Sequence, residues 1–256
     1  MKNLFLFLFL LVVFTSKAQD NRVSGLNSRQ FTKYWKVESE SPDYKVTFQG
    51  DTAEIVSPKG LTLWRKEKMS GKVTIEYDAC VVVESDGDRL SDLNCFWMAS
   101  DPQYPDNLWK REKWRSGIFL NCYSLQLYYL GYGGNHNSTT RFRRYDGDES
   151  GITNPKARPA ILKEYTDAGH LLKPNHWYHI KITNENNRVS YYIDGERLVD
   201  FRDAEPLREG WFGFRTTLSR TRITNFSYEC SSQEAAAVPL QWIGETPRQD
   251  KACLLY

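Results

Sequence analysis

The sequence is poor in the residues that most often build metal and redox centres. Its 256 residues include four histidines, three methionines and five cysteines, and no C-x-x-C pair of the kind that holds structural zinc. An odd number of cysteines leaves at least one thiol outside any disulfide within the chain. The pairings of Cys80 with Cys95 and of Cys230 with Cys253 stay open. We therefore expect no cofactor.

Long hydrophobic runs are absent after the N-terminal region. The apolar run from Leu4 to Phe14 is too short to cross a bilayer. It follows Lys2 and precedes the small-residue context Ala18-Gln19, an order typical of a cleavable secretory signal peptide, which we predict for residues 1–19. No cysteine stands near Ala18, so a lipoprotein anchor is not expected. The sequence thus predicts a secreted or periplasmic protein without a membrane span.

Neither sign of charge is in excess. The whole sequence has 34 basic and 32 acidic residues. Residues 1–19 contain Lys2, Lys17 and no acid, so their removal leaves 32 basic against 32 acidic residues. A neutral chain lacks the general positive field that attracts nucleic acid, so no nucleic-acid partner is expected. The local cluster of Arg141, Arg143 and Arg144 instead indicates a site for a small anionic group.

Strand-forming segments dominate the rest of the chain. Segments that alternate apolar and polar residues, or are rich in β-branched and aromatic residues, recur between turn signals. They cover residues 73–83, 116–120, 125–132, 139–145, 177–183, 188–193, 210–216 and 222–228. No amphipathic helical stretch of comparable length occurs. This pattern predicts an all-β protein, a jelly-roll β-sandwich that forms a single domain over residues 20–230, followed by a C-terminal tail at 231–256.

Two long irregular stretches interrupt the strands, at residues 85–114 and 147–174. Long loops inside a compact domain are often binding loops. Between them lies the most distinctive segment, from Tyr123 to Tyr145, which holds five tyrosines and three arginines around the turn Gly133-Gly134. Phenol rings offer flat faces to sugar rings, and guanidinium groups match carboxylates and sulfates. The segment therefore predicts a surface that binds an acidic oligosaccharide or polysaccharide.

The second half of the chain carries a recognisable series of motifs, which are Trp177-Tyr-His-Ile-Lys-Ile, Tyr192-Ile-Asp-Gly-Glu and Gly210-Trp-Phe-Gly-Phe-Arg-Thr. This ending resembles the concanavalin-A-like lectin and glucanase superfamily, whose jelly roll is shared by lectins, laminarinases and several polysaccharide lyases. The tyrosine-rich segment is similar to that of uncharacterised secreted proteins from polysaccharide-utilisation clusters of Bacteroidetes. The resemblance implies a concanavalin-A-like fold and substrates that contain rhamnose or uronate, such as ulvan or pectin fragments.

A lyase or dehydratase that works by β-elimination would need three kinds of group, all present in this segment. A cation neutralises the uronate carboxylate, a base removes the adjacent proton, and an acid protonates the leaving oxygen. Alternation places Arg141, Arg143 and Tyr145 on one strand face, opposite Phe142 and Arg144. We predict the catalytic residues to be His136, Tyr132, Arg141, Arg143 and Tyr145. We predict the substrate-binding residues to be Asn135, Tyr123, Tyr128, Trp109, Trp114 and Arg115.

Two other functions remain open. A non-catalytic carbohydrate-binding, lectin-like module needs the same aromatic and hydrogen-bonding groups but no base. A jelly-roll glycoside hydrolase needs two carboxylates on one strand face, and Glu84-Ser-Asp86-Gly-Asp88 superficially resembles such a motif. Gly87 favours a turn there, so the segment is better explained as a solvated acidic loop or a structural calcium site.

Overall fold

The structure is a computed structural model that describes residues 22–231. The signal peptide predicted for residues 1–19 lies outside the described residues, as does the predicted tail apart from Ser231. No helix within residues 22–231 is long and apolar enough to cross a membrane.

Strands form most of the described chain. They are β1 (Val23–Ser24), β2 (Trp35–Ser39), β3 (Lys45–Gln49), β4 (Thr52–Arg65), β5 (Met69–Ser70), β6 (Lys72–Val81), β7 (Leu93–Ser100), β8 (Gln126–Gly133), β9 (Thr139–Asp146), β10 (Lys163–Tyr165), β11 (Tyr178–Glu185), β12 (Arg188–Ile193), β13 (Glu196–Arg202) and β14 (Glu209–Ser231). The helical segments are one turn or little more: α1 (Phe31–Tyr34), α2 (Glu112–Arg115), α3 (Gly134–Asn137), α4 (Ser150–Thr153), and the 3-10 turns η1 (Leu108–Arg111), η2 (Leu120–Ser124), η3 (Pro155–Ala157) and η4 (Ala168–His170).

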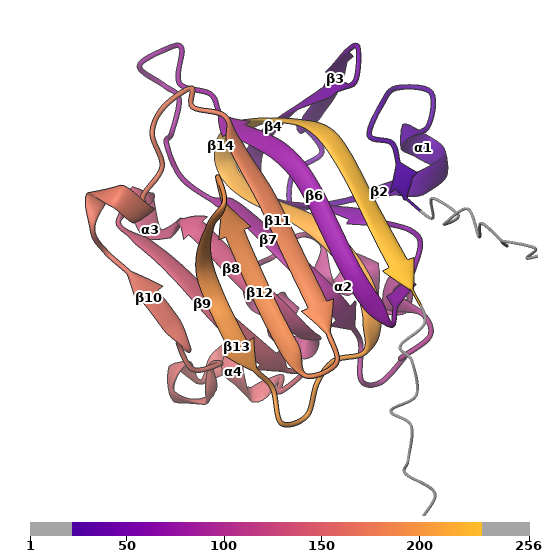
Figure 1. The fold of residues 1–256 in the computed structure, drawn as a ribbon. Coiled ribbons are helices and arrows are strands. Elements are labelled where there is room, and N and C mark those ends of the chain that lie inside the picture. Colours follow the sequence, from indigo (N-terminus) through magenta and orange to yellow (C-terminus); the bar gives the residue numbers. More distant parts are fainter. Residues whose placement is uncertain (1–21, 232–256) are drawn as a thin grey trace, which may run out of the picture.

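The strands pair antiparallel and form two layers joined by two long strands (Figure 1). One layer, here called the covered sheet, has the order β10-β9-β8-β7-β14-β4-β2. The other, the open sheet, has the order β13-β12-β11-β6-β14-β4-β3. Strand β14 pairs with β7 through its first part and with β6 through its second part, so it belongs to both sheets. The predicted all-β sandwich is confirmed.

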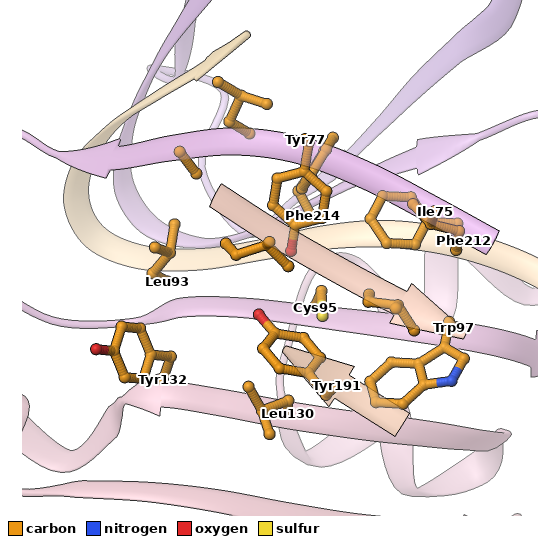
Figure 2. Packing of buried hydrophobic residues seen from close by; sticks show 14 of the residues in the cluster. Ile75, Tyr77, Leu93, Cys95, Trp97, Leu130, Tyr132, Tyr191, Phe212 and Phe214 are labelled. Carbon is orange, nitrogen blue, oxygen red and sulfur yellow. The ribbon is translucent and has the colours of Figure 1, made fainter. Parts of the chain in front are cut away.

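Period-two alternation explains which side chains fill the space between the sheets. In β8, Tyr128, Leu130 and Tyr132 point inward, and Leu127 and Tyr129 point outward. Figure 2 shows Leu130 and Tyr132 among the core residues of the facing strands. Successive side chains of a strand point to opposite faces. Strand β8 is therefore buried on both faces.

A second apolar cluster covers the outer face of the covered sheet. Trp64, Phe96 and Tyr145 belong to its strands, and Leu108 and Cys122 come from the long loop between β7 and β8, residues 101–125, here called the covering loop. Burial of about 150–250 Å² by each aromatic side chain favours docking of this loop on the sheet. All four cysteines of the described part, Cys80, Cys95, Cys122 and Cys230, are free. The Cys80–Cys95 pairing is thus not formed, and Cys253 lies outside the described residues.

Candidate functional site

One row of side chains crosses the outer face of the covered sheet at right angles to its strands. Arg141 in β9 pairs with Gly131 in β8, Gly131 with Asn94 in β7, and Asn94 with Arg215 in β14. Neighbouring strands lie about 4.8 Å apart, so the backbones of Arg141 and Arg215 are separated by about 14 Å. The row therefore places two cationic side chains at positions three strands apart.

A groove of about 570 Å³ lies over this row. Its lining brings five arginines, two tyrosines and only two acidic residues together. They are Arg89, Arg141, Arg143, Arg158, Arg215, Tyr123, Tyr129, Glu40 and Asp92. The volume is within the range of about 300–1,000 Å³ that accommodates small organic ligands. The groove is thus a cationic site in a chain that is almost neutral overall.

Of the three arginines of β9, Arg141 and Arg143 face this groove and Arg144 does not. Arg141 Nε lies 2.6 Å from Glu164 Oε1 on β10, and Arg143 donates a hydrogen bond to the carbonyl oxygen of Pro159. Arg144 points to the other face, where its Nε lies 2.8 Å from Asp203 Oδ2. The predicted alternation is confirmed, and Phe142 lies in the core between the sheets.

The floor of the groove contains a hydrogen-bond acceptor without a partner. Asn94 is 6% exposed, and its Nδ2 donates to Asp92 Oδ1 over 3.2 Å. Arg89 Nη1 lies 2.9 Å from the other oxygen of Asp92. Because a carboxylate only accepts hydrogen bonds, the amide nitrogen of Asn94 must face Asp92. Its Oδ1 is left without a partner within residues 22–231.

Arg215 connects the floor to the covering loop. It is 3% exposed, donates to the carbonyl oxygen of Gly117, and stacks its guanidinium 5.6 Å from the ring centroid of Phe119. Gly60 makes room beside it, since a Cβ atom there would lie 2.4 Å from both Arg215 Nη2 and Glu40 Oε1. The Arg215 guanidinium at this end of the groove is therefore held by the covering loop, and Gly60 of β4 leaves the space that it occupies.

Tyr123 and Tyr129 bring phenol groups into the groove. Neither hydroxyl makes a hydrogen bond within the described part of the chain, and both residues are largely buried. Burial raises the pKa of both phenols, against the smaller opposing effect of nearby arginines. At neutral pH both are therefore protonated donors. Gly131 permits the position of Tyr129, because a Cβ there would lie 2.3 Å from Tyr129 Oη.

Three other tyrosines predicted at the site lie away from the groove. Tyr128 and Tyr132 are inward-facing residues of β8, so the predicted substrate-binding and catalytic roles do not fit their positions. The hydroxyl of Tyr128 donates to Asp203 over 2.7 Å, and that of Tyr132 to the carbonyl oxygen of Leu171 over 3.3 Å. Tyr145 does face outward but is fully buried beneath the covering loop. It cannot reach a ligand in the groove in this conformation.

The turn between β8 and β9 carries the predicted Asn135 and His136. Both have left-handed backbone angles, with φ of 53° and 59°, and both side chains are exposed. Asn135 lines the groove and donates to Ser138 Oγ over 3.1 Å. His136 is adjacent in sequence but is not part of the lining.

The predicted residues of the covering loop, Trp109, Trp114 and Arg115, do not line the groove. Trp109 packs edge-on against Trp211, with ring centroids 6.1 Å apart. Trp114 is 44% exposed, and the guanidinium of Arg111 lies 5.0 Å from its ring. Arg115 is fully buried and lies 3.0 Å from Glu38 Oε2. Fully buried Arg115 cannot contact a ligand, whereas the binding roles of Trp109 and Trp114, which lie outside the groove lining, stay predictions.

The acidic segment after β6 does not form a hydrolase pair. Glu84 forms ion pairs with Arg220 and Arg222, both at 3.0–3.1 Å. Asp88 Oδ2 accepts hydrogen bonds from the backbone nitrogens of Glu84 and Ser85, which closes a turn. The carboxylates therefore do not share a strand face, as that reaction requires. Across residues 22–231, no group of three or more His, Cys, Asp or Glu side chains could hold a metal ion.

Sequence reasoning missed Arg89, Asn94, Arg158 and Arg215. One signal was present for Arg215. Phe212 and Phe214 alternate along the strand and point into the core, so the next residue, Arg215, has to point away from it. Asn94 has the same signal, because it stands between Leu93 and Cys95, which both point into the core. Arg89 and Arg158 carry no local signal. These residues join the groove through loop conformation and through pairing between strands distant in the sequence.

Comparison with solved structures places the fold. A Bacillus subtilis protein of unknown function with a galectin-like fold has a TM-score of 0.62 and 15% identity, covering 78% of this chain and 91% of that chain. The carbohydrate binding module CBM66 from Bacillus subtilis has a TM-score of 0.51 and 16% identity, covering 76% and 94%. The exoplasmic/lumenal domain of VIP36 in its Ca²⁺/Man3GlcNAc-bound form has a TM-score of 0.55 and 9% identity, covering 85% and 91%.

These low identities show the fold alone, a galectin-like jelly roll consistent with the predicted concanavalin-A-like architecture. No curated protein matched the sequence. The sequence does match, over residues 55–226 and so over more than half of its length, the family described as "Domain of unknown function (DUF6250)". The chain belongs to this family.

Proposed function

We propose that the protein binds acidic oligosaccharides in the groove of the covered sheet. The single observation that carries this proposal is the set of five arginines around two protonated tyrosines in one cavity. Guanidinium groups bind carboxylates and sulfates through paired hydrogen bonds, and phenol rings pack against the apolar faces of sugars. Fragments that contain uronate or sulfated rhamnose, as in pectin or ulvan, offer both features.

The resemblance to solved structures supports sugar binding over other uses of a cationic groove. Two of the similar structures are named for carbohydrates, as a carbohydrate binding module and as a domain bound to Man3GlcNAc. The predicted signal peptide fits the same proposal, because export would bring the groove to glycans outside the cell.

Calorimetric titration with oligogalacturonates and sulfated ulvan oligosaccharides tests the proposal. Arg143→Ala should lower affinity by about tenfold or more, because a hydrogen bond to a charged group contributes about 1.5–3 kcal/mol. Arg188→Ala is a matched control, since Arg188 is an exposed arginine of the open sheet. The proposal is wrong if the wild-type protein binds none of these ligands, or if Arg143→Ala and Arg188→Ala bind them equally well.

A second candidate function is β-elimination on the same ligands, by cleavage or by loss of water. The observation that favours it is Tyr129, whose raised pKa keeps the phenol protonated beside the arginines. In this reaction, a base removes the proton next to the uronate carboxylate. The electron pair forms a carbon–carbon double bond as the bond from the β carbon to its oxygen breaks, and that oxygen takes a proton from Tyr129. Glu40 in the groove and His136 at the hairpin turn are the candidate bases.

Ultraviolet absorbance of the conjugated double bond measures this reaction, and product mass separates cleavage from loss of water. Tyr129→Phe should abolish product formation and leave binding within about threefold, because one hydroxyl is removed and the ring remains. Binding of acidic oligosaccharides without any new absorbance would leave the lectin-like function alone.

A further inference from the structure

A second row of side chains crosses the opposite outer face, on the open sheet. Arg222 in β14 pairs with Cys80 in β6 on one side and with Glu54 in β4 on the other, and Glu54 pairs with Thr47 in β3. Trp177 immediately precedes Tyr178, the residue of β11 that pairs with Ala79. The row therefore continues from Cys80 to Trp177. It ends in a large aromatic side chain.

Trp177 is exposed and its position is fixed. The side chain is 42% exposed, in contrast to the buried tryptophans of the core. Two residues before it, Asn175 makes three hydrogen bonds to the end of β6 and the residues just after it. Its backbone nitrogen donates to Val81 O over 3.0 Å, its Nδ2 donates to Val83 O over 2.7 Å, and its Oδ1 accepts from Val83 N over 2.9 Å. An exposed indole on a fixed backbone loses little conformational freedom on binding a ligand.

The indole borders a cleft of about 410 Å³ that contains polar groups without partners. The cleft is lined by Thr47, Phe48, Gln49, Thr52, Glu54, Trp177 and Arg222. The side chains of Thr47, Gln49 and Thr52 make no hydrogen bond to any described residue. A ligand rich in hydroxyl groups could use them as donors and acceptors.

Charge in this cleft is balanced. Arg222 Nε lies 2.7 Å from Glu54 Oε2, and its Nη2 lies 3.1 Å from Glu84 Oε1. Arg220 also contacts both acids, at 3.0 Å in each case. Bonds to these arginines outweigh burial and lower the pKa of Glu54. The charges of the two arginines are balanced by those of the two glutamates, so the cleft has no net charge that would attract an ionic ligand.

We propose that this cleft is a second carbohydrate site, which binds a neutral pyranose unit stacked on Trp177. The apolar face of the sugar covers the indole, Glu54 accepts from one hydroxyl, and Arg222 donates to its neighbour. Gln49, Thr47 and Thr52 contact the remaining hydroxyls. The site shares no residue with the cationic groove and differs from it in the charge of its ligand.

Titration with neutral hexasaccharides tests this site, using xylo-, cello-, manno- and galacto-oligosaccharides as the probes and protein NMR or calorimetry as the measurement. At least one probe should bind the wild-type protein. Trp177→Ala should lower its affinity by about tenfold, the effect of one lost aromatic stacking contact, and Trp177→Phe should lower it less. Trp114→Ala is the matched control, because Trp114 is equally exposed but lies outside the cleft.

The outcomes separate this site from the groove. Neutral probes that bind Arg143→Ala as well as they bind the wild-type protein support the second site, whether or not acidic ligands bind. No binding of any neutral hexasaccharide at millimolar concentration would overturn the inference. Equal affinity of Trp177→Ala and wild-type protein, with melting temperature unchanged, would also overturn it.

Discussion

The two outer faces of the sandwich differ in what lies over them. The outer face of the covered sheet holds an apolar cluster of strand and loop residues, and Arg115 of the covering loop is fully buried there. The outer face of the open sheet carries charges in exposed pairs, such as Arg188 with Asp200. Strands β4 and β14 contribute to both faces. Strand β14 thus supplies Arg215 to the cationic groove on one face and Arg222 to the neutral cleft on the other, whereas β4 lines only the cleft.

The largest effect should come from breaking the buried ion pair that joins the covering loop to β2. Arg115→Ala leaves Glu38 buried without its partner, at a cost of about 3–5 kcal/mol in the free energy of unfolding. Burial already raises the pKa of Glu38, although Arg115 partly opposes this shift. Arg188→Ala on the open face should leave stability nearly unchanged. Urea denaturation of both variants measures the difference, and an equal loss for the two would contradict the contrast between the faces.

A smaller loss should follow when the groove floor is filled. In Gly131→Ala, the added Cβ would lie 2.3 Å from Tyr129 Oη, so the tyrosine must move. Overpacking of this kind costs about 1–3 kcal/mol, and the displaced ring should also weaken binding of acidic oligosaccharides. Gly87→Ala is the control, because no atom lies within 4 Å of its added Cβ. Thermal melting and titration together measure the effect. Unchanged affinity in Gly131→Ala would remove Tyr129 from the site.

Salt should distinguish the two faces by ligand affinity. Raising ionic strength from about 0.1 M to about 1 M shortens the Debye length from about 10 Å to about 3 Å. Binding of an acidic oligosaccharide in the groove should then weaken by about threefold or more, since it depends on several arginines. Binding of a neutral sugar in the cleft beside Trp177 should stay within the error of the titration. The same salt dependence for both ligands would show that they share one site.

The smallest effect concerns the loop between β10 and β11. His170 Nδ1 lies 2.7 Å from Asp167 and its Nε2 lies 3.1 Å from Glu196. Burial lowers the pKa of His170, but the bonds to Asp167 and Glu196 outweigh it and raise the pKa above its usual 6.5. The protonated form therefore stabilises the fold below about pH 6.5, and this contribution is lost as pH rises through the raised value.

The expected contribution of His170 is at most about 1 kcal/mol, because its ion pairs are near the surface. Unfolding free energies of wild-type protein and His170→Gln should differ below about pH 6 and converge above about pH 8. A difference that grows with rising pH would contradict the assigned sign. The loop at this edge of the covered sheet would then be fastened by other contacts.

Several features of the site followed from local sequence. Alternation in β9 correctly separated Arg141 and Arg143 from Phe142, because the two faces of a strand depend only on its own backbone. Alternation in β8 also separates Tyr129 from Tyr128 and Tyr132, but the phenol ring fits both a core and a groove. The alternation alone therefore could not tell which face of β8 would meet a ligand, and site roles were predicted for the inward-facing Tyr128 and Tyr132.

The sequence by itself determined an all-β chain, the faces of its strands and the position of a distinctive arginine and tyrosine segment. These properties depend on neighbouring residues and on the two-residue period of an extended backbone. Only the tertiary structure decided that Arg215 and Asn94 lie in a row with Arg141, and that Arg115 is buried. Strand register and loop docking depend on burial of apolar surface between segments distant in sequence, which no local pattern encodes.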